Sequence, residues 1–250
     1  MRLLASILAL LTIASAQAAP PASLSSRADA YLAPYVAGNN FSGSVLIAQH
    51  GRILLRQGYG LANRELDVPN TPATCFQIAS ISKPFTAAGV LLLVEQGKVA
   101  LTDPVAKFVP DFPHGNEITV EHLLTHTSGI PDINGLPAYG ELSRSPQTPA
   151  SLIAAFRSAP LDFAPGTKYA YSNSNYNLLA RIIEIVSGLD YGTYMRERVF
   201  SPLGLKATDH PANAADLLPD RAAGYAPRGA TGIENAPYLD WTAKTGNGSL

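Results

Sequence analysis

Ser80 and Lys83 are the residues of this chain whose types and spacing most directly suggest chemistry. They lie at the start of an apolar stretch, Phe76 to Lys98, that predicts a helix, so both side chains share one helix face. An unprotonated lysine can take the proton of a serine hydroxyl and so activate a weak nucleophile. The first turn of a helix also stabilises developing negative charge. Taken alone, the pair is a weak signal, and it fits an N-cap serine and a surface lysine better than a catalytic pair.

A second group, Tyr171-Ser172-Asn173, lies in a loop just before another predicted helix. A tyrosinate beside a lysine is a plausible general base. The asparagine amide can hold a lysine and a substrate amide together, since it both donates and accepts hydrogen bonds. The structural alternatives are a packed aromatic ring for Tyr171 and a helix N-cap for Asn173.

Three segments, in the order expected, resemble the class C β-lactamase-related serine hydrolases: IASISKPFTAAGVLLLVEQGKVALTDPVAKFVPDFP, HLLTHTSGIPD and PGTKYAYSNSNYNLLARIIEIVSG. This family includes β-lactamases, D-alanyl-D-alanine carboxypeptidases and peptidases, and esterases. The resemblance implies that Ser80 is the acylated nucleophile, Lys83 its activator and Tyr171 the base in both steps. Asn173 corresponds to the asparagine of the Y-x-N element and is expected to bind substrate.

The resemblance also implies the fold. We expect an α/β (α+β) architecture, with helices packed on an antiparallel sheet and a helical subdomain from about Pro104 to Leu205. The cleft between these parts would hold the site. No metal or organic cofactor is implied. The expected partner is a small-molecule or peptide substrate: a β-lactam, a D-alanyl peptide or an ester. The alternative is a penicillin-recognising sensor that is acylated without efficient turnover.

Lys244-Thr245-Gly246 matches the letters of the K-T-G element of this family, but we expect it to be a coincidence. It follows Tyr171 too closely, and its surroundings are glycine-rich without the alternation of a strand. The segment TGNGSL instead resembles a glycine-rich stretch of the family that precedes a helix. We therefore expect the chain to be the N-terminal portion of a longer protein. The third catalytic element, the closing strands and the second oxyanion donor would then lie beyond Leu250.

The composition and the first residues indicate an exported globular protein. The chain has 250 residues, 46% hydrophobic and 15% charged, with a net charge of −1, so no polyanionic partner such as nucleic acid is indicated. Residues 1–18 combine Arg2, a short apolar run and a small-residue cleavage site, which is typical of a secretory signal. Cleavage after Ala18 would leave residues 19–250 as a periplasmic or secreted domain without a membrane span.

Three competing sites are disfavoured by their residues. His122 and His126 have the spacing of zinc ligands on a helix, but Leu123 stands where H-E-x-x-H needs a glutamate, and no third ligand stands out. The G-x-S-x-G string of α/β-hydrolases is absent from the sequence. The single cysteine, Cys75, lies in an apolar stretch and is expected to be a buried, inert thiol.

Hydrophobic periodicity and turn residues predict the remaining elements. His50-Gly51 would join two strands of a hairpin, Ser44 to Gln49 and Ile53 to Gln57. The Ser80 helix would end at Gly97 and be central, because its middle is apolar on all sides. The other expected helices are Leu24 to Val36, a short one within TVEHLLTHTSGI, Ser151 to Ser158, about Asn175 to Ser187, and Tyr191 to Phe200. Asn134 to Pro149 and the chain after Leu205 are expected to be loops.

Overall fold

The computed structural model describes residues 23–211, 217–229 and 232–250. The expected signal segment, residues 1–18, lies outside these ranges. Within them, no helix combines the length and the apolar character that crossing a membrane requires.

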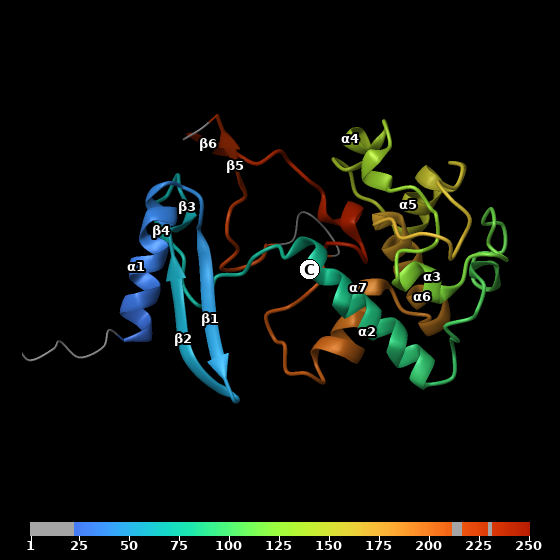
Figure 1. The fold of residues 1–250 in the computed structure, drawn as a ribbon, viewed down its shortest axis with the longest axis horizontal. Coiled ribbons are helices and arrows are strands. Elements are labelled where there is room, and N and C mark those ends of the chain that lie inside the picture. Colours follow the sequence, from blue (N-terminus) through green and yellow to red (C-terminus); the bar gives the residue numbers. More distant parts are fainter. Residues whose placement is uncertain (1–22, 212–216, 230–231) are drawn as a thin grey trace, which may run out of the picture.

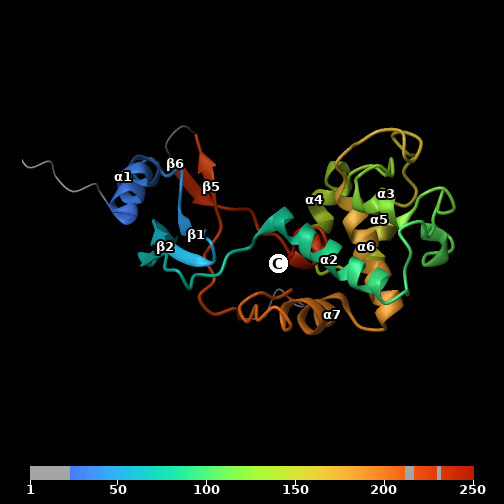
Figure 2. The same cartoon turned by 60° about the horizontal axis from the view of Figure 1, so that its bottom comes forward.

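The described residues form two lobes joined by extended segments (Figures 1 and 2). The first lobe contains one helix and three antiparallel strand pairs, β1 with β2, β3 with β4 and β5 with β6. Its elements are α1 (Leu24–Ala37), β1 (Gly43–Gln49), β2 (Arg52–Tyr59), β3 (Leu61–Asn63), β4 (Val68–Pro69), β5 (Tyr225–Arg228) and β6 (Gly232–Asn235).

The predicted hairpin around His50 and Gly51 is confirmed. Both residues have positive φ, 49° and 74°, which lets β1 turn directly into β2. The strands pair from Gly43 opposite Tyr59 to Gln49 opposite Arg52. α1 lies beside this hairpin in Figure 1 and is tied to β2. The first lobe thus combines a helix with antiparallel strands, whereas the second lobe is helical.

The second lobe is helical. Its helices are α2 (Ser82–Glu95), α3 (Val120–Leu124), α4 (Tyr139–Leu142), α5 (Pro149–Phe156), α6 (Asn173–Ser187) and α7 (Tyr191–Met195). Short turns complete it: 3₁₀ turns η1 (Ala79–Ile81), η2 (Val105–Lys107), η3 (Ile133–Gly135) and η5 (Trp241–Lys244), and the π-helical turn η4 (Arg196–Phe200). Residues 104–205, predicted as a helical subdomain, hold α3 to α7, and α2 shares their hydrophobic core. The domain boundary itself stays a prediction.

α6 is the centre of this core and packs against α2, α3, α5 and α7. Four of its apolar residues are fully buried: Leu178, Leu179, Ile182 and Ile183. The helix ends at Gly188, whose φ of 74° gives a left-handed cap. α6 therefore provides a rigid base for the loop that precedes it, which carries Tyr171.

Several boundaries differ from the sequence-based expectation. The segment expected as one surface loop, Asn134 to Pro149, contains α4, and the chain after Leu205 contains the β5–β6 hairpin and η5. These elements are short and depend on tertiary contacts rather than on periodicity; the Tyr225 hydroxyl, for example, accepts the Arg64 backbone N–H at 2.7 Å. The helix expected from Tyr191 to Phe200 changes into a π turn halfway.

Two burial expectations are wrong. α2 is not covered on all sides, since Val90 and Leu93 are buried while Leu91 is 47% exposed. In the described residues α2 packs on α6 and α7 through one face, and its N-terminal end points toward the first lobe (Figure 1). Cys75 is half-buried rather than buried, because it lies on the segment that links the lobes, where its backbone pairs with Asp220 and Ala222.

Residues 245–250 are buried and pack against the start of α2. The Gly246 carbonyl accepts the Thr86 hydroxyl at 2.7 Å, and the Leu250 N–H donates to Ser82 Oγ at 3.1 Å. This glycine-rich segment is thus a structural part of the wall around Lys83. Gly246 itself has φ 79°.

A substitution at Gly246 tests this packing. A Cβ there would lie 2.3 Å from the Tyr176 carbonyl oxygen and would also adopt a strained φ. We expect Gly246→Ala to lower the free energy of unfolding in urea by roughly 2–5 kcal/mol. Gly97→Ala is the matched control, since φ is 69° there but nothing lies within 4 Å. It should cost only about 1 kcal/mol, and equal losses would contradict the packing.

Candidate active site

Ser80 lies in the 3₁₀ turn η1, immediately before α2, and its side chain is exposed. The expectation that it occupies the first turn of the long helix therefore needs a small correction, because Ile81 is the N-cap of α2. The preceding residue, Ala79, has φ 47°, a left-handed conformation that a residue with a Cβ rarely adopts. Such strain costs about 1–3 kcal/mol and is found mainly at functional sites. Here it presents the serine hydroxyl to solvent.

The structure brings three of the predicted residues together around one oxygen. Ser80 Oγ lies 2.7 Å from the Tyr171 hydroxyl and accepts a hydrogen bond from Lys83 Nζ at 3.2 Å. Tyr171 reaches the serine from the loop before α6, and 43% of its surface is exposed. The serine proton can therefore pass to the neutral Lys83 amine, or to the Tyr171 oxygen in its phenolate form, without any rearrangement of the chain.

Lys83 is buried beneath this surface, with only 5% of it exposed. Its amine donates to Asn173 Oδ1 at 2.8 Å and to the Asn247 carbonyl oxygen at 2.7 Å. Burial lowers the pKa of Lys83 from 10.5 to about 8, and the charge of Asp132 opposes part of this shift. Roughly a tenth of the Lys83 side chains are then neutral at pH 7 and able to accept a proton.

His126 supports Tyr171 from below, a role that the sequence did not reveal. The two rings stack with centroids 4.6 Å apart and an interplanar angle of 31°. His126 Nδ1 accepts the Ser172 backbone N–H at 3.2 Å, so this nitrogen carries no proton. Burial, and then the charge of Lys83, lower the pKa of His126, so the ring is neutral at pH 7. The His126 ring thus holds Tyr171 in place by packing against its ring and by accepting the backbone N–H of the next residue, Ser172.

Asp132 is the second residue that sequence reasoning missed. Its carboxylate accepts hydrogen bonds from both the backbone and the side chain of Asn173. Both His126 and Asp132 lie within HLLTHTSGIPD, a segment that showed the family resemblance without assigning a role to its residues. Nothing in the sequence linked either residue to Tyr171 or Asn173, because these contacts form only in the folded chain.

A family model described as Beta-lactamase matches residues 28–250. The chain belongs to the Beta-lactamase family. Penicillin-binding protein 4* of Bacillus subtilis (strain 168) is 36% identical over 172 residues, which cover 68% of this chain and 38% of the relative. The chain spans half or less of the length of the curated relatives it matches.

Solved structures agree with this membership and show the β-lactamase/transpeptidase-like α+β fold. A penicillin binding protein from Bacillus halodurans has a TM-score of 0.72 and 30% identity, over 82% of this chain and 63% of that one. D-amino acid amidase from Ochrobactrum anthropi SV3 has a TM-score of 0.78 and 26% identity, over 90% of this chain and 65% of that one. The solved structures that this chain resembles thus include an amidase as well as a penicillin-binding protein.

In this Beta-lactamase family member, Lys244 is not part of the hydrogen-bonded group formed by Ser80, Lys83 and Tyr171. It ends the 3₁₀ turn η5 rather than lying on a strand, and its amine donates to Asn134 Oδ1 at 3.0 Å. The amine also lies 4.7 Å from the centroid of the Tyr139 ring. Among the described residues, no hydrogen bond joins Lys244 to Ser80. The K-T-G string is thus not the strand-borne element, as the sequence argument expected.

The two histidines of the rejected zinc reading have separate structural roles. His122 forms a capping box with Thr119 at the start of α3, in which each side chain accepts the other's backbone N–H. His126 contacts the active-site tyrosine. In the part of the chain that the structure describes, no three histidine, cysteine or acidic side chains are grouped as metal ligands would be.

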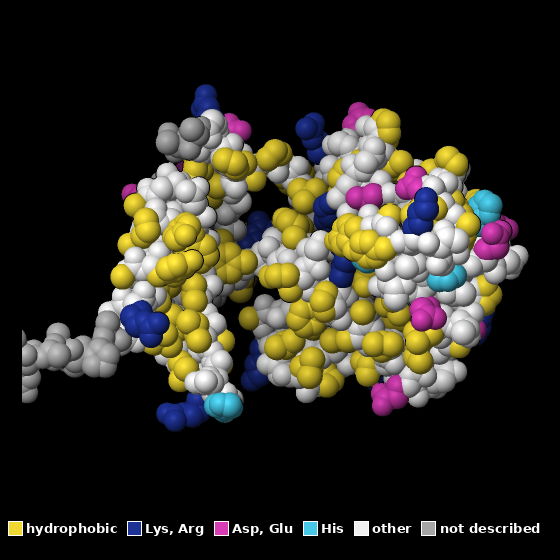
Figure 3. Space-filling view, in the orientation of Figure 1, with side chains coloured by type: hydrophobic (Ala, Val, Ile, Leu, Met, Phe, Trp, Pro, Cys, Tyr) yellow, Lys and Arg dark blue, Asp and Glu magenta, His cyan; other side chains and the backbone are white. Residues whose placement is uncertain are grey.

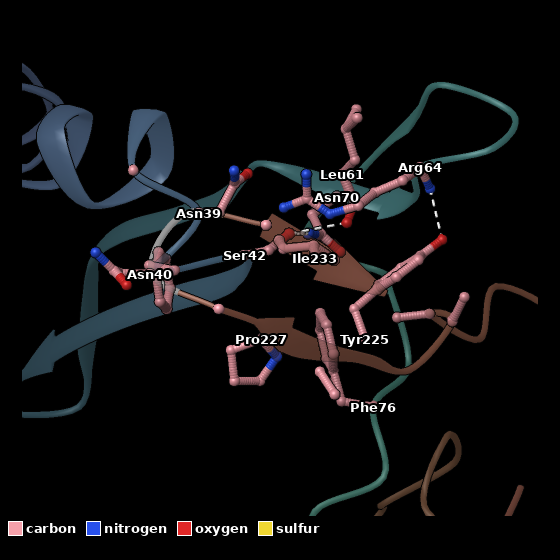
Figure 4. A pocket seen from close by; sticks show the side chains of 17 residues that line it. Asn39, Asn40, Ser42, Leu61, Arg64, Asn70, Phe76, Tyr225, Pro227 and Ile233 are labelled. Atoms are coloured by element: carbon pink, nitrogen blue, oxygen red, sulfur yellow. Dashed lines mark hydrogen bonds between the residues drawn. The ribbon is translucent and has the colours of Figure 1, made fainter. Parts of the chain in front are cut away.

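A cavity of about 420 Å³ lies away from the serine, in the first lobe (Figure 4). It is bordered by Asn39, Asn70 and Ile233, between the α1–β1 connection and the β5–β6 hairpin. Ser80 and Lys83 are not among its lining residues. The space-filling view shows a hollow between the two lobes and hydrophobic side chains spread over the first lobe (Figure 3). The chemistry of the Ser80 group, rather than this cavity, therefore identifies the site.

The pKa of Lys83 predicts the pH dependence of acylation. Lys83 must be neutral to accept a proton, so kcat/KM of the full-length protein for a neutral ester should rise with pH and level off above a midpoint near the Lys83 pKa of about 8. The control is Lys98→Ala, which removes an exposed amine beyond the C-terminal end of α2 and should leave the rise of kcat/KM with pH unchanged. A profile that is flat across this region would contradict the role of Lys83 as a base.

Proposed function

We propose that this chain carries the active site of a serine hydrolase that works by acylation and deacylation of Ser80. The observation that carries the proposal is the Ser80 hydroxyl within 2.7 Å of Tyr171 and 3.2 Å of Lys83. A hydroxyl that contacts both a phenol and an amine of lowered pKa is activated as a nucleophile.

In acylation, Ser80 Oγ attacks the substrate carbonyl carbon and its proton passes to Lys83 or Tyr171. The tetrahedral intermediate then collapses as the bond between the carbonyl carbon and the leaving nitrogen or oxygen breaks. The same proton is delivered to the leaving group, which departs as a neutral amine or alcohol. Tyr171 is well placed for this delivery, because it is partly exposed while Lys83 is buried.

In deacylation, a water molecule attacks the acyl carbon of the Ser80 ester. Tyr171, in its phenolate form, takes a proton from this water, the ester bond to Oγ breaks, and the proton returns to Oγ as the carboxylic acid product leaves. His126 keeps the phenol in place through both steps. Lys83 stays hydrogen-bonded to Asn173 and Asn247, so its amine can exchange protons with the phenol or serine without moving away.

The proposed substrate is an acyl compound with an accessible carbonyl: a β-lactam, a D-alanyl peptide or an ester. Relatives named as penicillin-binding proteins and as D-amino acid amidase support an acyl group next to a D-configured centre. Asn173 already accepts a hydrogen bond from Lys83, and we propose that it also binds the substrate. The signal-like residues 1–18 support export, so we propose a periplasmic or secreted site of action.

The decisive experiment is active-site labelling of the full-length protein with a fluorophosphonate, followed by peptide mass mapping. We expect the label on the peptide that contains Ser80 and no label in Ser80→Ala. The neighbouring Ser82→Ala is the matched control, because Ser82 is buried and should not react. Label that survives Ser80→Ala would overturn the assignment. Steady-state hydrolysis of a p-nitrophenyl ester then separates an enzyme from a sensor that reacts only once.

A further inference from the structure

The Asp132 carboxylate contacts both the backbone N–H and the side-chain amide of Asn173. Its Oδ1 accepts the Asn173 backbone N–H at 2.9 Å and the side-chain Nδ2 at 3.0 Å, and Oδ2 lies 3.2 Å from the same Nδ2. We propose that Asp132 is a positioning residue for acyl transfer, which holds the Asn173 amide with its oxygen toward Lys83. This inference rests on the proposed function.

The orientation of the Asn173 amide follows from the chemistry of its two neighbours. A carboxylate only accepts hydrogen bonds and an ammonium only donates them, so the amide between them has a single favourable orientation. Its NH₂ group must face Asp132, and its oxygen must face Lys83. Asn173 is 5% exposed, so water does not offer it comparable partners. Without the carboxylate, the amide could turn its NH₂ group toward the amine and remove one of the contacts that hold Lys83.

The charge of Asp132 gives this arrangement a measurable signature. Lys83 Nζ lies 4.8 Å from the centroid of the Tyr171 ring and 5.5 Å from the centroid of the Tyr176 ring, which is on α6. The remaining titratable groups around it come from other elements: His126 after α3, Asp132 before η3 and Lys244 in η5. Within the described ranges, Asp132 is the one acid whose charge acts on Lys83.

Two substitutions separate the charge from the geometry. Asp132→Asn removes the negative charge but keeps an oxygen that can accept both Asn173 hydrogen bonds. Asp132→Ala removes both. Loss of the anion disfavours the ammonium form, so the pKa of Lys83 falls and more neutral amine is present at a given pH. The asparagine variant should therefore be faster than the parent at low pH, an effect that damage to the fold does not produce.

The test measures the second-order rate of Ser80 labelling by a fluorophosphonate against pH in the full-length protein. We expect Asp132→Asn to move the acid limb down by about 0.5–1 pH unit, since an intervening amide and partial exposure weaken the coupling. Below the limb this makes labelling roughly three- to tenfold faster, while the plateau changes by less than about threefold. Asp132→Ala should lose about tenfold or more at the plateau, because the amide is no longer fixed.

Glu141→Gln is the matched control, since Glu141 is exposed on the nearby α4 and contacts none of these groups in the structure. It should leave the limb and the plateau unchanged. The inference would be overturned if Asp132→Asn left the pH at which labelling rises unchanged and Asp132→Ala labelled Ser80 at high pH as fast as the parent. A parent protein that does not label at Ser80 would instead contradict the proposed function, so the two failures are distinguishable.

Discussion

The buried amine of Lys83 is the constraint on which the rest of the site depends. An ammonium group placed in a protein interior costs several kcal/mol unless other groups replace its hydration. Here Asn173 Oδ1 and the Asn247 carbonyl oxygen provide that replacement, at 2.8 and 2.7 Å. These acceptors come from α6 and from the glycine-rich segment 245–250, whereas Lys83 is on α2. Three separate parts of the chain must therefore meet before the lysine can be buried.

The surrounding groups offset only part of the hydration that the Lys83 amine loses on burial, and this is why the amine can act as a base. If the acceptors and Asp132 offset all the lost hydration, the pKa of Lys83 would stay near 10.5, and the amine would almost never be neutral at pH 7. Burial prevails, and the pKa falls to about 8. The strained Ala79 presents Ser80 to solvent, and the buried His126 packs beneath the Tyr171 ring, so both oxygens lie at the surface. The proton path thus runs from a buried amine to an exposed hydroxyl.

Much of this arrangement could be predicted from the sequence, and the reasons for the successes and failures are physical. The β1–β2 hairpin and α6 were predictable because turn residues and apolar spacing are local signals. Ser80, Lys83 and Tyr171 were found through the spacing of one pair and a family resemblance. Their roles stay predictions, although the structure places their side chains together.

The residues that were missed act through tertiary contacts. Asp132 and His126 lie far along the chain from Ser80, and their importance depends on which atoms they face after folding. The exposed side of α2 was missed for a similar reason, because an apolar sequence shows what a helix can bury but not what covers it. Leu91 illustrates this point, since it is half exposed on an otherwise apolar helix.

The central claim is that Lys83 and Tyr171 handle one proton of Ser80, and a double-mutant cycle in the full-length protein tests it most directly. Lys83→Ala and Tyr171→Phe should each lower kcat for an ester by roughly 10²-fold, as expected when a general base is lost. Groups that act as a unit lose activity non-additively, so the double variant should be little worse than the poorer single variant. A double variant that shows the full product of the two losses would contradict a shared proton path.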